Sequence, residues 1–383
     1  ARDKFGHTGT VTFTIDTTAP VYTNLGVLNV SNYPDKGTYE YVKNGDTIRV
    51  IVRFAEKLAV EPQVSINGGE KLPCTFRQQS SSETSFVYMT DFTIPENEET
   101  LTEGEINVVV SDYADLAGNV GVTLTNENIN DNAYPGVTYD RTAPGYTVKT
   151  ESKGTEAKNI YSNVSFKLED NYMLDKVILN GVEKDLTDNK WSDLNGIEPG
   201  KYGAIEGENT LEIYDLAGNK TEYKFTLDTT APAREYSTVR LSTEKEANYV
   251  EKDGNKYYYV KNGENFEFAM AFTEELKQVP TVTIGGRNVE MTLNEKVKQE
   301  ESKYLYEGTF TIGENEQELQ EGNLEIKVSN IVDFAGNEME ETIQTPTSNG
   351  RVVVYDRTAA GYTVKPESKG TEAKNIYSNV SFK

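Results

Sequence analysis

The sequence predicts an all-β chain made of small antiparallel sandwiches in tandem, and three observations predict it. Residues 47–54 and 105–110 alternate apolar and polar side chains, which is the period of a strand with one buried face. Asn-Gly pairs between such stretches are hairpin-turn signals, and they lie at 44–45, 67–68, 180–181 and 262–263. Two short motifs also recur along the chain, which indicates a repeated structural unit.

The first motif is Asp-x-Ala-Gly-Asn, and each copy is followed by a second motif that closes the unit. Copies of the first lie at 115–119, 215–219 and 333–337, with a degenerate copy at 3–7. The second begins with Asp and runs through Thr-Ala, at 16–20, 140–144, 228–232 and 356–360. Residues 145–167 return as 361–383 with one difference, Thr150 against Pro366. A second repeat, at an offset of 218, carries Tyr41 onto Tyr259 and Asp115 onto Asp333, so a long and a short unit alternate.

The second motif sets the expected domain boundaries. We expect a long-type domain at 16–139, a short-type domain at 140–227 and a second long-type domain at 228–355. Residues 1–15 are expected to be the C-terminal hairpin of a preceding domain. Residues 356–383 are expected to start a further short-type domain and to be disordered or loosely paired.

The short type should contain a hairpin at Asn180-Gly181 and, in order, strands near 145–149, 162–168, 210–214 and 220–227. The long type has extra residues after its Gly-Asn. We expect them, around 126–135 and 345–350, to form a loop that interrupts the last strand.

Composition excludes several functions. The net charge of −24 argues against a nucleic-acid partner, because phosphate binding needs a basic surface. The chain has no run of eighteen apolar residues, so the sequence predicts no membrane span. His7 is the only histidine, which excludes a His-based triad or a His-containing zinc site, and no carboxylate pair stands apart from the repeated ones, so we expect no enzyme. The single cysteine, Cys74, lies in a strand-like stretch and is expected to be buried and inert.

The pairing of Asp-x-Ala-Gly-Asn with a downstream Asp-Thr-Thr-Ala-Pro resembles the bacterial immunoglobulin-like repeats of large surface adhesins and cell-wall proteins. The resemblance covers essentially the whole chain. It implies tandem immunoglobulin-like β-sandwiches arranged end to end, an extracellular location at the bacterial cell surface or in a secreted protein, and a role as a stalk. The partners it implies are the neighbouring domains of the same chain, which should be monomeric. Some members bind calcium at domain junctions.

The immunoglobulin-like topology would bring acidic residues together at each junction. The turn between the last two strands lies where the chain enters the domain, so each first-motif Asp should face the Asp of its linker. Calcium takes six to eight oxygen ligands. The expected ligands are Asp16, Glu56, Asp115 and Asn119; Asp140, Glu169, Asp170, Asp215 and Asn219; and Asp228, Glu274, Asp333 and Asn337. The motif is also a good tight turn, since Asp forms Asx-turns and Gly supplies a positive φ, and both interpretations stay open.

These observations favour a structural stalk or spacer that presents a distal binding region. The alternative is a ligand-binding module, in which the extra loops and tyrosines of the long units contact a host protein or glycan. Another is a set of accessory domains of a large secreted carbohydrate-active enzyme. Tyr257–Tyr259 and Trp191 could stack on sugars, but alternation along a strand explains the tyrosines and a core or rim position explains Trp191. Lys149 and Asn219 are formal candidates for an isopeptide bond that nothing in their spacing singles out.

Overall fold

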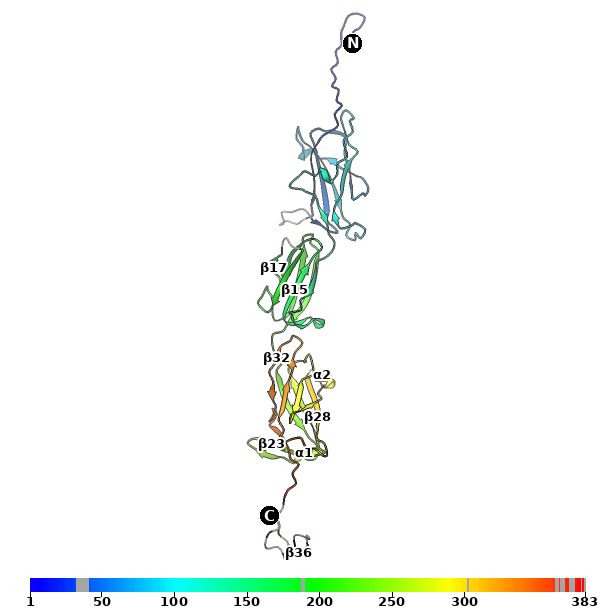
Figure 1. Ribbon diagram of the computed structural model, residues 1–383. Coiled ribbons are helices and arrows are strands. Elements are labelled where there is room, and N and C mark those ends of the chain that lie inside the picture. Colours follow the sequence, from blue (N-terminus) through cyan, green and yellow to red (C-terminus); the bar gives the residue numbers. More distant parts are fainter. Residues whose placement is uncertain are drawn as a thin grey trace. The chain divides into compact units, whose positions relative to one another are not determined.

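The protein is all-β, a series of immunoglobulin-like antiparallel sandwiches (Figure 1). The computed structural model describes residues 1–31, 41–186, 190–301, 303–361, 365, 369–371, 376–379 and 381. The chain divides into two compact units, one of residues 1–150, 165–204 and 209–224 and the other of 151–164, 205–208 and 225–383. This division passes through the short repeat, so the boundaries at Asp140 and Asp228 stay a prediction.

The first long repeat is a two-sheet sandwich. One sheet has the order β1-β3-β8-β7, and the other faces it through β10-β5-β6. Apolar side chains alternate along β3 and β5 and meet in one core with Tyr88 and Tyr139, which are fully buried. The elements are β1 (Tyr22–Asn29), β2 (Tyr41–Val42), β3 (Thr47–Phe54), β4 (Leu58–Val60), β5 (Gln63–Ile66), β6 (Leu72–Pro73), β7 (Thr75–Phe76), η1 (Gln78–Ser80), β8 (Phe86–Thr93), β9 (Gly104–Glu105), β10 (Val108–Ser111), β11 (Ala114–Asp115), η2 (Asn126–Asn128) and β12 (Thr138–Tyr139).

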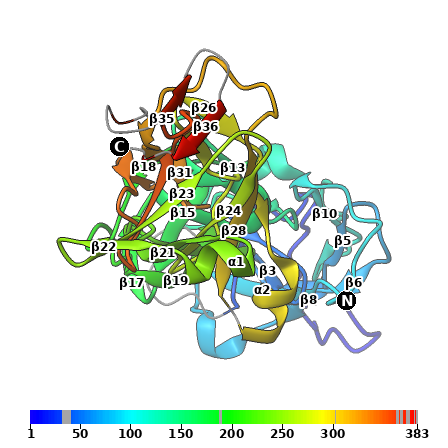
Figure 2. The ribbon, with the colours of Figure 1, turned by 90° about the horizontal axis from the view of Figure 1, so that it is seen from below.

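The second long repeat has the same plan, with sheets β21-β24-β28-β27 and β26-β25-β30-β33. Strands β24 and β28 pair along their full length, and their labels lie next to each other in Figure 2. Its elements are β21 (Arg234–Arg240), α1 (Thr243–Ala247), β22 (Val250–Lys252), β23 (Asn255–Val260), β24 (Asn265–Phe272), β25 (Thr281–Ile284), β26 (Arg287–Val289), β27 (Thr292–Leu293), α2 (Glu295–Glu301), β28 (Tyr304–Thr311), β29 (Gly322–Asn323), β30 (Ile326–Ser329), β31 (Ile331–Val332), β32 (Glu338–Met339), β33 (Thr342–Ile343) and β34 (Arg351–Tyr355). No helix in the described part of the chain is long and apolar enough to cross a membrane.

The short repeat contains the predicted strands. Its elements are β13 (Gly145–Val148), β14 (Lys153–Thr155), η3 (Glu156–Lys158), β15 (Ile160–Glu169), β16 (Leu174–Leu179), β17 (Val182–Asp185), β18 (Trp191–Ile197), β19 (Gly207–Asp215) and β20 (Lys220–Leu227). Asn180 adopts a positive φ of 50° in the turn between β16 and β17, as the Asn-Gly signal predicts. In each of the three repeats, a strand from its first half runs parallel to its last strand: β2 with β12, β15 with β20, and β23 with β34.

The extra residues of the long repeats interrupt the last strand, as expected. In the second long repeat they lie between β33 and β34, and Ser348 exchanges hydrogen bonds with Ser237 of β21. Cys74 is buried, and burial raises the pKa of its thiol to about 12, as expected for an inert cysteine. The prediction that 356–383 is disordered or loosely paired falls partly outside the described residues, which include there the short strands β35 (Lys369–Thr371) and β36 (Ile376–Asn379).

Candidate functional site: three acidic clusters

Three clusters of carboxylates form where a linker meets a sandwich. In each one, a ligand oxygen from every member lies within 4.8 Å of the others. Each takes one carboxylate from the linker, one from the loop that follows β3, β15 or β24, and one from the Asp-x-Ala-Gly-Asn turn. The members are Asp16, Glu56 and Asp115; Asp140, Asp170 and Asp215; and Asp228, Glu274 and Asp333.

The turn itself holds its aspartate in a fixed orientation. Asp115 Oδ1 accepts hydrogen bonds from the backbone N–H groups of Ala117 (2.8 Å) and Asn119 (2.9 Å). Gly118 has a φ of +90°, a conformation that glycine adopts without steric cost. The predicted tight turn is therefore present, and its hydrogen bonds also fix the orientation of the Asp115 carboxylate. The backbone of Asn219 and of Asn337 makes the same bond to its own aspartate.

The asparagines of the motif connect the turn to the linker. The side-chain nitrogen of Asn119 donates to Asp115 Oδ2 (2.7 Å) and to the backbone carbonyl of Asp16 (3.2 Å). Asn219 and Asn337 repeat both contacts with their own aspartate and linker. These asparagines therefore tie the linker to the turn through the amide nitrogen, and ligation of a cation by the amide oxygen stays a prediction.

Glu169 does not belong to the middle cluster, which corrects the expectation. It is the last residue of β15, where it shares an exposed face with Lys167 and forms an ion pair with it at 2.8 Å. Asp170 follows the strand end and carries the cluster carboxylate. Its backbone N–H donates to the Lys190 carbonyl, and its Oδ2 accepts from Tyr172 N (2.7 Å). Only Asp170 of the two expected acidic residues is placed to contribute.

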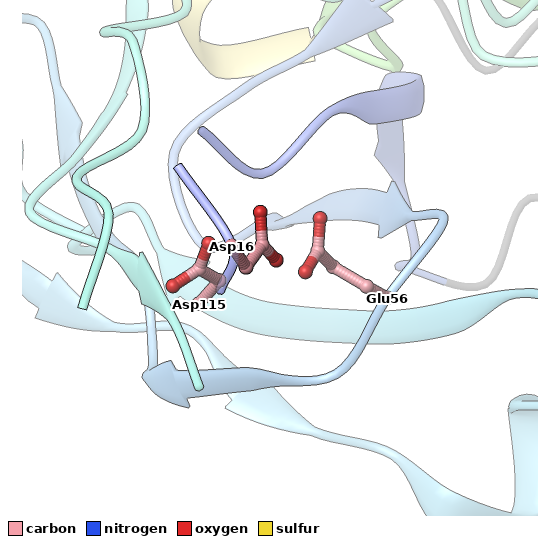
Figure 3. A group of neighbouring side chains, drawn as sticks. All are labelled: Asp16, Glu56 and Asp115. Atoms are coloured by element: carbon pink, nitrogen blue, oxygen red, sulfur yellow. The ribbon is translucent and has the colours of Figure 1, made fainter. Parts of the chain in front are cut away.

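The first cluster is the most open of the three. Figure 3 shows the carboxylates of Asp16 and Glu56 facing one another with Asp115 beside them. Burial and the charges of Asp115 and Asp16 raise the pKa of Glu56. Burial by itself also raises the pKa of Asp115, but hydrogen bonds from Asn119 and Ala117 outweigh it and hold that pKa below its ordinary value. Glu56 is therefore the group that carries the repulsion.

The middle cluster is the most deeply buried. Asp140 and Asp215 are each 1% exposed. Burial, reinforced by the charges of Asp215 and Asp170, raises the pKa of Asp140 to about 7. Burial also raises the pKa of Asp215 to about 6, against the opposing hydrogen bonds of Asn219. Two buried oxygens, Asp140 Oδ2 and Asp170 Oδ1, accept no hydrogen bond from any described residue. Buried polar atoms without a partner are uncommon and costly.

The third cluster lies between these two extremes. Asp333 is buried, whereas Asp228 and Glu274 are half-buried. Burial and the charges of Asp228 and Asp333 raise the pKa of Glu274 to about 7. Burial also raises the pKa of Asp228. As in the first cluster, the repulsion among the three carboxylates affects mainly the pKa of the glutamate from the loop.

These donor sets fit a hard divalent cation. Each cluster offers only oxygen atoms, the ligands that calcium takes. Among the described residues, no lysine or arginine forms an ion pair with any of the nine carboxylates. Burial, reinforced by uncompensated charge of this kind, raises the pKa values of Glu56, Asp140 and Glu274, whereas hydrogen bonds lower that of Asp115. Asp140 Oδ2 and Asp170 Oδ1, the two oxygens of the middle cluster without a hydrogen-bond partner, could each ligate a bound cation.

The other candidates for chemistry have different environments. Lys149 Nζ donates to Asn195 Oδ1 at 2.9 Å, and the Asn219 amide donates to Asp215 Oδ2, so each member of the formal isopeptide pair is bonded to another residue. Tyr258 is buried and Tyr259 is exposed, which is the alternation that a strand imposes. Trp191 is 60% exposed and lines a cavity of about 930 Å³ with Lys149 and Asp193. It lies at the rim of its sandwich, and its exposure leaves the face of the indole available.

Comparisons with known proteins find similarity to solved structures alone. No protein-family model matches the chain, and no curated protein matches its sequence. Among solved structures, an I-band fragment of titin is 8% identical, with a TM-score of 0.33, over 90% of this chain and all of that one. A tetra-tandem repeat from the extending region of a large adhesion protein is 14% identical, with a TM-score of 0.25, over 94% of this chain and 80% of that one. SGBP-B of Bacteroides ovatus, solved with a mixed-linkage heptasaccharide, is 12% identical, with a TM-score of 0.16, over 92% of this chain and 75% of that one. At identities this low, none of them indicates a ligand or partner for this chain.

Proposed function

We propose that this chain is a spacer segment of a bacterial cell-surface protein, stiffened by calcium at its domain junctions. The observation that supports this most directly is the composition of the clusters, each of which joins one linker carboxylate to two from the sandwich that follows. A cation held there would fix the linker against the sandwich. The distal binding region of the parent protein would then be held away from the cell.

Repetition suits such a role. In a tandem array each unit contacts only its neighbours, so stiffness depends on the junctions and not on any single surface. Without a cation, each junction contains like charges that repel one another and loosen the linker. Extracellular calcium modules bind with dissociation constants of about 10⁻⁴ to 10⁻³ M, so the proposed sites would be filled outside the cell.

The test is thermal unfolding of the full chain in 10 mM calcium and in chelator, with small-angle scattering in both. At this concentration each filled site should stabilise its junction by about 1.5 to 3 kcal/mol. We expect a higher melting temperature and a longer, narrower distance distribution with calcium. Unchanged unfolding and scattering would refute the cation and leave the turns as purely structural features.

A second candidate function is favoured by one observation, the exposed Trp191 in the cavity of the short repeat. An indole face beside Lys149, Asp193 and Lys190 offers the stacking surface and the hydrogen-bonding groups that a saccharide needs. Trp191 is the only tryptophan, so its fluorescence reports directly on this cavity. Titration with soluble gluco-, chito- and manno-oligosaccharides should change the emission of the native chain. No change with any of them would exclude the saccharide site.

A further inference from the structure

The three Asp-x-Ala-Gly-Asn turns differ in what covers them. The alanine of the motif is 1% exposed in the second copy (Ala217) and 0% exposed in the third (Ala335). In the first copy Ala117 is exposed, and Leu116 beside it is 76% exposed. An added Cβ would meet nothing within 4 Å at Gly118. One motif with one local conformation is thus covered in two copies and open in one.

The third copy shows what closes a turn in front of a long repeat. The hairpin formed by β14 and the start of β15 supplies the contacts. Thr155 Oγ1 donates to the Phe334 carbonyl (2.8 Å), and Ser162 N donates to the Ala335 carbonyl (3.0 Å). Lys158 Nζ lies 3.7 Å from the centre of the Phe334 ring, within the range of a cation–π interaction. A hairpin of the short repeat is therefore a specific cover for this turn.

Residues 8–15 indicate the same partner independently. An offset of 212 carries Asp16 onto Asp228 and places residues 8–15 on β20, the last strand of the short repeat. The equivalents of Tyr223, Phe225 and Leu227, which are buried, are Val11, Phe13 and Ile15. These three alternate along the segment and are between 74% and 79% exposed. The segment thus has the pattern of a short-type strand whose buried face is uncovered.

We infer that Leu116, Ala117 and Gly118 form a docking surface for a short-type sandwich that carries the hairpin of residues 153–162. Residues 8–15 would be the last strand of that same sandwich. Leu116 replaces Phe334, so the hydrogen bonds to the two backbone carbonyls would be kept while the cation–π contribution would be lost. The contacts are hydrogen bonds to backbone carbonyls of the turn together with burial of its alanine, and they do not depend on a bound cation.

The experiment extends the full chain by placing a copy of residues 140–214 directly before Asp3, which completes a short-type sandwich. Hydrogen exchange is measured in chelator, so that calcium at Asp115 cannot protect the turn. In the unextended chain the amides at 116–119 should exchange at least about tenfold faster than those at 334–337. In the extended chain they should slow to a similar rate. The matched control carries the equivalents of Thr155→Val and Lys158→Ala in the added copy only, and it should lose most of this protection.

A second measurement applies even if the added sandwich does not fold. Thr155→Val and Lys158→Ala in the chain as it stands should raise exchange at 334–337 about tenfold toward the rate at 116–119. Equal exchange of the two turns in the unmodified chain would overturn the inference. So would an extension that folds, as judged by protection of its own strands, yet leaves 116–119 unchanged. Because all of this is read in chelator, failure of the calcium proposal would not alter either outcome.

Discussion

The middle and third acidic clusters share a linker aspartate and a turn aspartate, and they differ in the third residue. In the middle cluster this is Asp170, whose backbone and Oδ2 are both held by hydrogen bonds. In the third it is Glu274, whose carboxylate accepts no hydrogen bond from any described residue. A short, fixed side chain makes a preorganised site, whereas a longer, free one must lose rotamer freedom on binding. The same motif is thus combined with a hydrogen-bonded third carboxylate in one cluster and with one that accepts no such bond in the other.

The two clusters also differ in which carboxyl groups have strongly raised pKa values. The strongly shifted groups of the middle cluster are Asp140 and Asp215, which are almost fully buried. The strongly shifted group of the third is the half-buried Glu274. Solvent can relieve repulsion at Glu274 by letting the side chain turn outward, and it has no such access to Asp140. Changes at the middle cluster should therefore have the larger effects.

The largest expected effect comes from Asp140→Asn, and its sign should depend on calcium. In chelator at pH 8 the substitution removes a buried charge that Asp215 and Asp170 repel, so the melting temperature should rise by roughly 4 to 8 °C, which corresponds to about 1 kcal/mol. In 10 mM calcium it removes a ligand, so the variant should melt below the native chain. Asp228→Asn should change in the same directions by less, because Asp228 is half-buried.

The control for this pair is Glu208→Gln, an exposed glutamate of the short repeat outside every cluster. It should leave both melting temperatures unchanged. If the melting temperature of the Asp140 variant shifts in the same direction with and without calcium, the prediction is wrong. The shifts should have opposite signs only if Asp140 is repelled by its neighbours in the empty site and ligates calcium in the filled one.

The next effect is a pH dependence whose sign follows from the raised pKa values. In chelator, folded Asp140 holds a proton up to about pH 7, whereas the unfolded residue loses it near the ordinary value of 3.8. The folded state therefore binds more protons in this window, and stability should fall as the pH rises from 4 to 7. Unfolding in urea at pH 5 and pH 8 measures this, and Asp140→Asn should flatten the slope.

An internal reference of opposite sign is Glu316, which is paired with Arg287. The hydrogen bond from Arg287 holds its pKa at about 2, below the ordinary 4.5. Its contribution is complete above pH 4.5 and is lost as the pH falls toward 2. Stability in chelator should thus decrease on both sides of about pH 4 to 5. A flat profile between pH 5 and 8 would contradict the buried charges of the middle cluster.

The smallest effect is expected from Glu169→Gln. Glu169 pairs with Lys167 on an exposed face, and such surface pairs contribute little to stability. The variant should keep the native calcium response, with a change within about 0.5 kcal/mol. Asp170→Asn, one residue along, should reduce the response of the middle junction. Equal losses from both variants would show that the cluster rearranges to recruit Glu169 in solution.

Much of the fold could be predicted from alternation along single strands. The last strand of the short repeat was expected at 220–227, and β20 spans Lys220–Leu227 because Tyr223, Phe225 and Leu227 point into the core. The site was harder to predict at the level of single side chains. Strand periodicity turns Glu169 outward beside Lys167, so that only Asp170, after the strand end, can face the linker. The orientation of the Asn119 amide depends on a linker carbonyl that is distant in sequence.

The sequence by itself determined the repeat, the tight turn with its fixed aspartate, and the set of acidic residues from which the clusters are drawn. These properties are local, because hydrogen bonds within five residues and the period of a strand decide them. Only the tertiary structure decided which carboxylates meet, how deeply each is buried, and that the turn at 115–119 is open while its two copies are covered. Those properties depend on burial and on contacts between segments far apart in the chain, so identical pentapeptides can have different environments.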